Sequence, residues 1–311
     1  MAAAAIEFTG VSKIYKRWFS EERVEALSNV SFEVIPGEVC AFLGPNGAGK
    51  TTSIGILMGF HFANAGTVRV LGYEPGDVRA KEQIGFLPEN FAFYKYLTGP
   101  KLLRLHRALA GRTAPGDEKL IGGLLAKVKL AGYENLKIGR YSRGMVQRLG
   151  IAQALLCDPQ LVILDEPTSG LDPAGRREVL QLLVTLKEEG KTIFLSSHIL
   201  PEVEQICDRV VIIDHGKLIR TGRLNDMLGS GTSVEIIIDR LPAEMETTVA
   251  QCGAAIERTP QAVKITTDGA HKRQIAEALW AGGCDVISLN PVRSTLEEVF
   301  LKTVDGKESA A

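Results

Sequence analysis

The chain has 311 residues, enough for about two domains, each with a core of its own. Its 36 Lys and Arg residues offset 37 Asp and Glu residues, so it lacks the basic excess of a protein that binds nucleic acid or an anionic membrane. The five cysteines form no C-x-x-C pair and no His stands at metal-ligand spacing, which argues against zinc and favours a reducing compartment.

Short β-type runs separated by Gly and Pro turns come first along the chain. We expect strands at residues 6–8, 30–34, 39–43, 67–70 and 84–87. Helical patterning follows, with helices expected at 101–109, 119–130 and 149–156. The first residues lack a basic segment followed by an apolar one, so we expect no signal peptide. No window approaches about 18 apolar residues, and we do not expect the chain to span a bilayer by itself.

Two unbroken apolar strands, 161–164 and 192–195, then alternate with helices. Continuous apolar runs of this kind are typical of a parallel sheet that is covered on both faces, so the fold class is α/β. A third run, 210–214, ends in His215-Gly216-Lys217, which resembles a hairpin turn.

The composition changes near Gly229-Ser230-Gly231, and we place a domain boundary there. The first domain is then residues 1–229 and the second is residues 230–311. The order of elements predicted in the second domain is β-α-β-β-α-β with one added helix, which is that of a small α+β, ferredoxin-like unit.

Residues 44–52 carry the most specific motif. They read Gly44-Pro45-Asn46-Gly47-Ala48-Gly49-Lys50-Thr51-Thr52 and fit the P-loop pattern G-x-x-x-x-G-K-[ST], so the whole segment is expected to bind a nucleoside triphosphate. The glycines allow positive φ angles and a close approach of backbone N–H groups to phosphate. Lys50 supplies charge for the β and γ phosphates, and Thr51 supplies a hydroxyl ligand for Mg²⁺.

The strand at 161–164 ends in two acids, Asp165 and Glu166, at the edge where open α/β sheets bind ligands. We expect Asp165 to reach the metal through its water shell and Glu166 to act on the water that attacks the γ-phosphate. Without the P-loop, an ordinary solvated Asp-Glu pair would be an equal alternative. His198 follows the next strand, where its imidazole could contact the γ-phosphate. A surface histidine that forms hydrogen bonds at a strand end is the alternative.

The segment 141–148 offers a second anion site. Ser142 suits a helix N-cap and Gly144 permits a close backbone approach. One nucleotide does not need two such sites on one chain, whereas two chains facing each other use both, which favours a two-fold dimer. Taken alone, the segment is better explained as an ordinary capped helix.

Together these motifs resemble the ATP-binding cassette (ABC) ATPase family over residues 6–228. The P-loop and the Walker B run 161–166 match in order and spacing, 169–172 resembles the D-loop, His198 holds the switch-histidine position and 141–148 resembles the signature motif. The resemblance implies a cassette of mixed sheet plus a helical subdomain at about 90–158. It also implies a head-to-tail dimer in which Mg²⁺ and ATP lie between one P-loop and the partner's signature, contacted by Ser142, Gly144 and Asp172. The partner is another copy or a paralogue.

Two departures resemble the cassettes of ABC-2 type exporters, in which the ATPase is a separate subunit. The signature has Tyr141, Arg143 and Met145-Val146 where the family usually has Leu, Gly and a directly following Gln. Glu89 stands in place of the Q-loop glutamine, and its carboxylate is expected to ligate Mg²⁺. Tyr15 is at the family's adenine-stacking position, with Trp18 as a substitute and ordinary core packing as the alternative.

The resemblance further implies an integral membrane permease subunit as partner and a place on the cytoplasmic face of the membrane. Aromatic residues follow the Q-loop, where the family receives a cytoplasmic helix of that subunit: Phe86, Phe91, Phe93, Tyr94 and Tyr96. Packing inside the helical subdomain is the alternative for each of them. A soluble ABC ATPase acting on ribosomes or DNA is the alternative function, which the single cassette and the absence of a long coiled coil disfavour.

Overall fold

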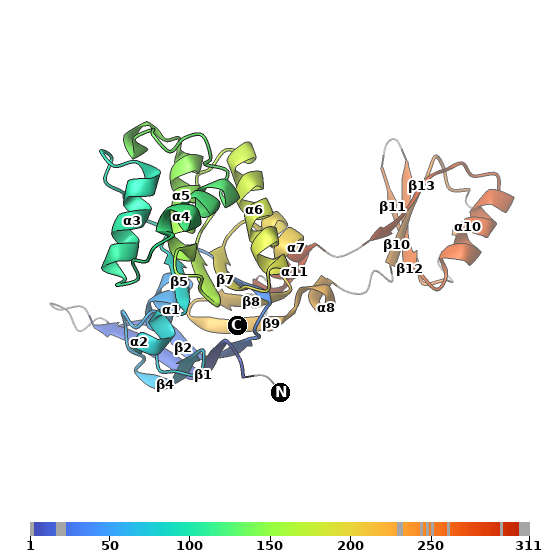
Figure 1. Ribbon diagram of the computed structural model, residues 1–311. Helices are drawn as coiled ribbons and strands as arrows, with labels where there is room; N and C mark the ends of the chain where they lie inside the picture. The colour runs from blue at the N-terminus through green and yellow to red at the C-terminus, as the bar shows by residue number, and fades with distance from the viewer. Residues whose placement is uncertain are drawn as a thin grey trace. The chain divides into compact units, whose positions relative to one another are not determined.

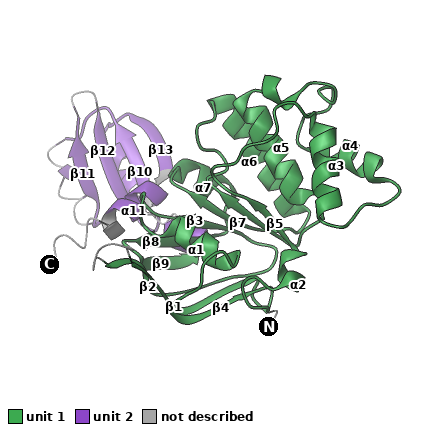
Figure 2. Ribbon diagram, turned by 90° about the vertical axis from the view of Figure 1, so that its left-hand side faces the viewer, with its two compact units in different colours: residues 1–223 green, residues 224–311 purple. Residues whose placement is uncertain are grey.

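The computed structural model describes residues 3–16, 23–228, 233–242, 245–246, 249, 252–259, 262–292 and 295–304. The chain divides into two compact units, residues 1–223 and 224–311 (Figure 2), compared with the predicted boundary between 229 and 230. Among the described residues, no helix is both long and apolar enough to cross a membrane.

The core of unit 1 is a six-stranded sheet in the order β5-β6-β7-β3-β8-β9 (Figure 1). The strands are β5 (Ile84–Leu87), β6 (Leu161–Asp165), β7 (Thr192–Ser197), β3 (Val39–Leu43), β8 (Arg209–Asp214) and β9 (Lys217–Arg223). The first five run parallel and β9 pairs antiparallel with β8 through the turn expected at 215–217. Every residue of β3, β6 and β7 is buried, as expected for strands covered on both faces.

A second, three-stranded antiparallel sheet has the order β2-β1-β4. Its strands are β1 (Ile6–Lys16), β2 (Arg23–Val34) and β4 (Ala65–Val70). Phe32 of this sheet packs on Phe42 of β3 and Phe194 of β7, with ring centroids 5.4 Å and 6.1 Å apart. The two sheets therefore share one core, to which helix α1 (Lys50–Leu57) adds Ile54, Ile56 and Leu57. This core holds the P-loop between a rigid strand and a buried helix.

Helices of two groups complete unit 1. The first gathers at one end of it (Figure 1): α3 (Gly99–Leu109), α4 (Asp117–Lys127), the 3₁₀ turn η1 (Ile138–Arg140) and α5 (Arg143–Leu155). These lie within the helical subdomain expected at about 90–158. The remaining helices are α2 (Val78–Lys81), α6 (Pro173–Glu188) and α7 (Leu200–Ile206). The α/β cassette with a mixed sheet and a helical subdomain is thus confirmed.

Unit 2 begins with α8 (Leu224–Leu228) and contains a four-stranded antiparallel sheet in the order β11-β12-β10-β13. Its other elements are β10 (Ser233–Ile238), β11 (Ala255–Arg258), β12 (Val263–Asp268), α10 (Lys272–Ala281), β13 (Val286–Val292) and α11 (Leu296–Val304). Residues 245, 246 and 249, between β10 and β11, are helical. This connectivity and strand order are those of a ferredoxin-like unit. Ile236, Ile265 and Leu279 are fully buried in its separate core.

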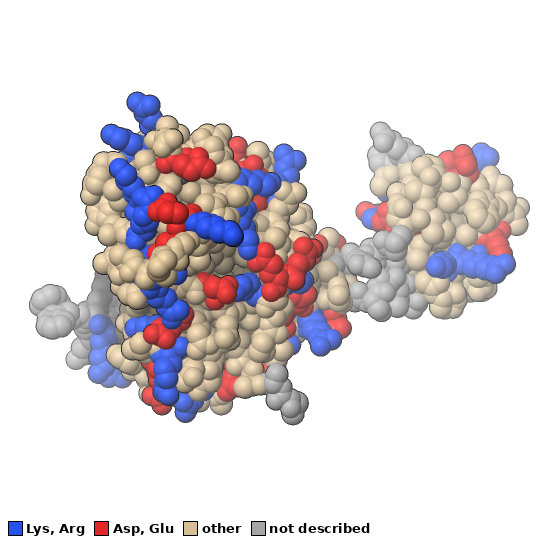
Figure 3. Space-filling view, in the orientation of Figure 1, with Lys and Arg blue, Asp and Glu red and all other residues tan. Residues whose placement is uncertain are grey.

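Charges of both signs are interspersed on the face shown in Figure 3. Their mixture agrees with the near balance of acidic and basic residues in the sequence.

Candidate functional site

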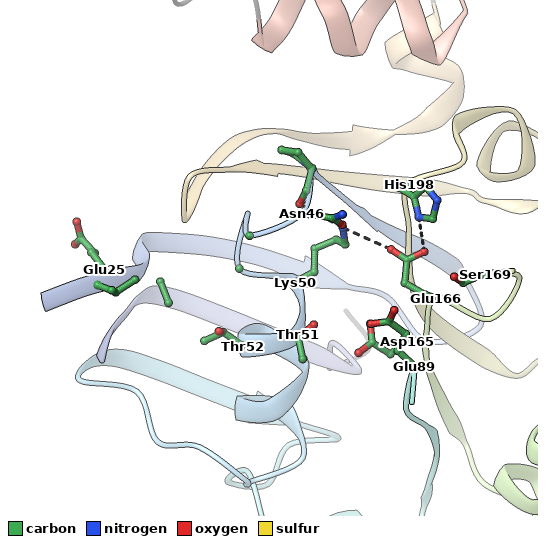
Figure 4. A pocket seen from close by; sticks show the side chains of 15 residues that line it. Glu25, Asn46, Lys50, Thr51, Thr52, Glu89, Asp165, Glu166, Ser169 and His198 are labelled. Atoms are coloured by element: carbon green, nitrogen blue, oxygen red, sulfur yellow. Dashed lines mark hydrogen bonds and ion pairs between the residues drawn. The ribbon is translucent and has the colours of Figure 1, made fainter. Parts of the chain in front are cut away.

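A cavity of about 340 Å³ opens at the carboxyl ends of the parallel strands (Figure 4). It brings together residues that the sequence predicted from four separate segments: Pro45, Asn46, Gly47, Gly49, Lys50, Thr51, Thr52, Glu89, Asp165, Glu166 and His198. Val24, Glu25, Ala26 and Ser169 complete its wall. The sheet explains this convergence, because β3, β6 and β7 are parallel neighbours and the segments after them meet at one edge.

The P-loop glycines serve two different needs. Gly47 and Gly49 have φ angles of 82° and 108°, in the region that side chains disfavour. Gly44 does not have positive φ, which differs from the expectation that all three glycines supply it. A Cβ at Gly44 would instead lie 2.3 Å from the carbonyl oxygen of Ile213, so the close approach of β8 excludes a side chain there.

Lys50 begins α1 and is 7% exposed. Its Nζ donates to the carbonyl oxygen of Gly44 at 2.7 Å and lies 3.5 Å from Oε1 of Glu166. A buried ammonium requires such partners, since the charge has lost most of its water. The lysine thus lies between the P-loop backbone and the acid at the end of β6.

Glu166 follows β6 with a φ of 50°, which is rare for a residue with a side chain. Its Oε2 lies 2.7 Å from Nδ1 of His198, and its backbone N–H donates to Oγ of Ser196 at 2.8 Å. Figure 4 shows the carboxylate between Lys50 and His198. Strained backbone persists where neighbours hold it, and it is concentrated at functional sites. The side chain is therefore held firmly at the centre of the cavity.

Asp165 ends β6 directly opposite Ser196 of β7, whose Oγ donates to its Oδ1 at 2.6 Å. Burial raises the pKa of Asp165, and the nearby Glu89 and Glu166 carboxylates raise it further, against the opposing effects of Ser196 and Lys50. A cation bound here would offset this accumulation of negative charge.

The donor set fits Mg²⁺. Thr51, Glu89 and Asp165 offer oxygen atoms to one cavity, and Figure 4 shows the two carboxylates side by side below Glu166. Over the described parts of the chain, no three His, Cys, Asp or Glu side chains form a complete metal cage. Mg²⁺ is bound in such sites by one or two carboxylates together with substrate phosphates and water, so these residues would hold it with the nucleotide.

Ser196 is predicted to be structurally necessary. Replacing Ser196 by Ala removes the donor to Asp165 and the acceptor for the Glu166 N–H, both buried. We expect the free energy of unfolding to fall by about 1–3 kcal/mol, the cost of leaving buried polar groups unpaired. Urea unfolding monitored by circular dichroism measures this. Thr185→Ala, which removes an exposed hydroxyl from α6, is the control, and an equal effect of the two variants would contradict the prediction.

Comparison with known proteins decides which family this site belongs to. Residues 27–169 match the ABC transporter family. An ABC transporter ATP-binding protein of Synechocystis, itself uncharacterised, is 38% identical over 306 residues, covering 96% of this chain and 84% of the relative. The chain belongs to the ABC transporter ATP-binding family. It is thus an ATPase subunit of the ABC transporter class, and its cofactors are ATP and Mg²⁺.

Other similar proteins include exporter subunits. The Nod factor export ATP-binding protein I of Rhizobium etli is 36% identical over 261 residues, 83% of this chain and 81% of its own. The linearmycin resistance ATP-binding protein LnrL of Bacillus subtilis is 32% identical over 286 residues, 88% and 92% of the two chains. A solved ATP-binding subunit of an ABC transporter is 32% identical with a TM-score of 0.62, and covers 72% of this chain and 91% of its own. A dimeric ATP-binding cassette in a post-hydrolysis state with ADP and Pi is 27% identical with a TM-score of 0.63, covering 71% and 99%.

Six residues predicted to bind nucleotide in this ABC subunit do not line the cavity: Gly44 and Ala48 of the P-loop, and Tyr15, Ser142, Gly144 and Asp172. Ser142 caps α5, accepting from the N–H of Met145 at 3.2 Å, and Asp172 caps α6, accepting from the N–H of Gly175 at 3.0 Å. A Cβ at Gly144 would lie 3.9 Å from Cα of Gly175, so the two helix starts are close neighbours. Tyr15 of β1 lies opposite the cavity-lining Val24 of β2, and its ring contacts His61 and Lys13. Trp18 lies outside the described residues.

Sequence reasoning missed two features of the ABC site. The sequence patterns assign no role to Ser196, although its position at the end of an apolar strand is a usable signal. The guanidinium of Arg143 lies where a side chain on Gly170 would be, so the signature segment rests on the D-loop of the same chain. Gly170 also has a φ of 65°, and both facts require glycine there.

Proposed function

We propose that this ATPase works as a head-to-tail dimer that drives a separate membrane subunit, as the motor of an exporter on the cytoplasmic face of the membrane. In the proposed reaction Lys50 binds the β and γ phosphates, while Thr51, Asp165 and Glu89 hold Mg²⁺. Glu166 orients the attacking water and takes up its proton, and His198 holds Glu166 and contacts the γ-phosphate. Support comes from the 2.7 Å contact between His198 and Glu166 at the cavity.

The dimer proposal is supported by the fact that the predicted nucleotide contacts fall into two separate groups. One set lines the chain's own cavity, whereas Ser142, Gly144 and Asp172 do not. Ser142 caps α5 and Gly144 lies in its first turn, and the N-terminus of a helix favours an anion. In the proposed dimer, the nucleotide bound to a second cassette provides the phosphate for the N-terminus of α5. Two-fold symmetry then completes both nucleotide sites at once. The dimeric cassette among the similar structures supports this arrangement.

A groove of about 460 Å³ supports a membrane subunit as partner. Its lining is mixed: it includes the apolar Ile84 and Phe86 of β5 and Ala154 of α5, and also Lys81, Glu82, Arg112 and Gln153. Tyr94 and Tyr96, which follow in the chain, are 58% and 69% exposed, and their rings are 5.7 Å apart. Exposed aromatic side chains are frequent anchors in interfaces. Phe91 differs, because it packs against Gly150 of α5 and so belongs to the helical subdomain itself.

Export as the direction of transport rests on the relatives. One is named for Nod factor export and another for linearmycin resistance, and both match more than four fifths of this chain. The departures in the signature and at Glu89 point to the same branch. We further propose that residues 230–311 are an accessory domain that stabilises the dimer, binds a regulator or contacts the membrane subunit.

The partner is tested by an affinity pull-down from detergent-solubilised cells of the source organism. Glu166→Gln protein with Mg-ATP is the bait, and mass spectrometry identifies what it retains. We expect a polytopic membrane protein at about a one-to-one ratio. Ribosomal or DNA-bound partners without a membrane protein would replace the proposal by the soluble alternative.

The exposed tyrosine pair beyond the groove is tested as an interface anchor in the same assay. We expect Tyr96→Ala to reduce recovery of the membrane protein about tenfold or more, because truncating an interface anchor costs 1–2 kcal/mol or more. Tyr133→Ala, which truncates a tyrosine that is 47% exposed elsewhere on the helical subdomain, is the matched control. Equal recovery with the two variants would place the interface elsewhere.

A further inference from the structure

A buried carboxylate that no motif includes joins the two segments that carry the predicted catalytic residues. Glu202 lies in α7, and its Oε2 accepts a hydrogen bond of 2.6 Å from Oγ1 of Thr168. Thr168 is 2% exposed and Glu202 is 9% exposed. A short hydrogen bond to a charged oxygen in a site with little water is among the stronger side-chain contacts.

The two partners stand close in sequence to Glu166 and His198. Thr168 follows Glu166 in the turn where the N–H of Ser169 donates to the carbonyl oxygen of Glu166 at 3.1 Å. Glu202 is in the first turn of α7, directly after His198, and its own N–H donates to the carbonyl oxygen of Ile199. The Thr168–Glu202 hydrogen bond thus joins the same two segments that the Glu166–His198 contact joins at the cavity.

The other carboxylate oxygen of Glu202 is linked to the D-loop through Arg176 of α6. Oε1 lies 3.9 Å from a terminal nitrogen of Arg176, whose Nε donates to the carbonyl oxygen of Leu171 at 3.0 Å. The N–H of Leu171 in turn donates to the carbonyl oxygen of Thr168 at 3.3 Å. Glu202 therefore contacts one end of the segment from Thr168 to Leu171 directly and the other end through Arg176.

We propose that Glu202 is a positioning residue that ties the D-loop to the switch histidine, so that His198 and Glu166 are aligned only when the D-loop is in place. The proposal rests on the roles given above to Glu166 and His198. In the proposed dimer Asp172 of the D-loop contacts the nucleotide together with the partner, so the Glu202 contacts would link the dimer interface to Glu166 and His198. Glu202 does not line the cavity, so we expect its effect to be on the geometry of hydrolysis and not on nucleotide binding.

The test compares Thr168→Val with Thr168→Ser. Valine keeps the shape and loses the hydroxyl, whereas serine keeps the donor. We expect Thr168→Val to lower kcat by about 10- to 100-fold, because small displacements of catalytic groups have effects of this size, with the Kd for ATP changed less than twofold. Thr168→Ser should restore kcat to within about threefold of wild type. Steady-state ATPase kinetics and titration with a fluorescent ATP analogue give the two quantities.

A double-mutant cycle with Glu202→Leu, whose side chain has no acceptor for the Thr168 hydroxyl, separates the contact from general damage. If the hydrogen bond carries the effect, the double variant is no slower than the slower single variant. A loss of kcat that serine does not restore, a parallel loss of ATP binding, or multiplicative effects in the cycle would overturn the proposal. Glu166→Gln is run alongside, because full activity in that variant would refute the assigned catalytic roles themselves, whatever Thr168→Val does.

Discussion

Glu166→Gln is expected to lower ATP turnover by about 10²–10⁴-fold while leaving ATP bound. The glutamine has the same shape but cannot take up a proton, and removing a positioned base typically has an effect of this size. The carboxylate lies 2.7 Å from His198 and 3.5 Å from Lys50, so it is central among the groups around the cavity. Steady-state phosphate release measures the effect.

The same variant should accumulate as a closed dimer with Mg-ATP, because the step that reopens the dimer is blocked. Size-exclusion chromatography with light scattering detects the dimer, and the wild-type chain with Mg-ADP is the control. Wild-type turnover in Glu166→Gln would remove Glu166 from its assigned role. Lost turnover without dimer formation would leave the catalytic role intact and contradict the dimer.

The parallel strands and their motifs could be predicted because their signals are local. The strand at 39–43 agrees with β3 at both ends, since a strand buried on both faces is apolar throughout. The strand expected at 6–8 is in fact the first part of β1, which continues to Lys16. Its later residues are half-exposed and its pairing with β2 contains register shifts, so neither an apolar run nor a regular alternation marked its end.

The site was predictable as a set of residues but not as a network. The P-loop and the two acids at the end of β6 are recognised from contiguous residues, and the cavity is lined by both acids and by most of the P-loop. The contacts of Ser196 with Asp165 and of Thr168 with Glu202 depend on which strands and helices become neighbours. Such pairings join residues that are far apart in the chain, and no local pattern encodes them. The close approach of Ile213 to Gly44 is hidden for the same reason.

Lys50→Ala is expected to abolish tight nucleotide binding. The lysine is buried, and its three donors already face the Gly44 carbonyl and the Glu166 carboxylate at the place where phosphates are expected. A hydrogen bond to a charged group is worth about 1.5–3 kcal/mol, which corresponds to about 10- to 150-fold in Kd. The variant also leaves the buried Glu166 without its ammonium partner, so negative charge accumulates where ATP must bind.

Titration with a fluorescent ATP analogue measures this loss, and thermal unfolding without nucleotide shows whether the fold survives. Lys127→Ala is the matched control, because that lysine forms an ion pair with Glu189 at the surface, outside the cavity. Exposed pairs contribute little, so the control should bind ATP like the wild type. If Lys50→Ala bound ATP within twofold of the wild-type Kd, the phosphates would have to lie elsewhere, and the cavity at the strand ends would lose its assignment.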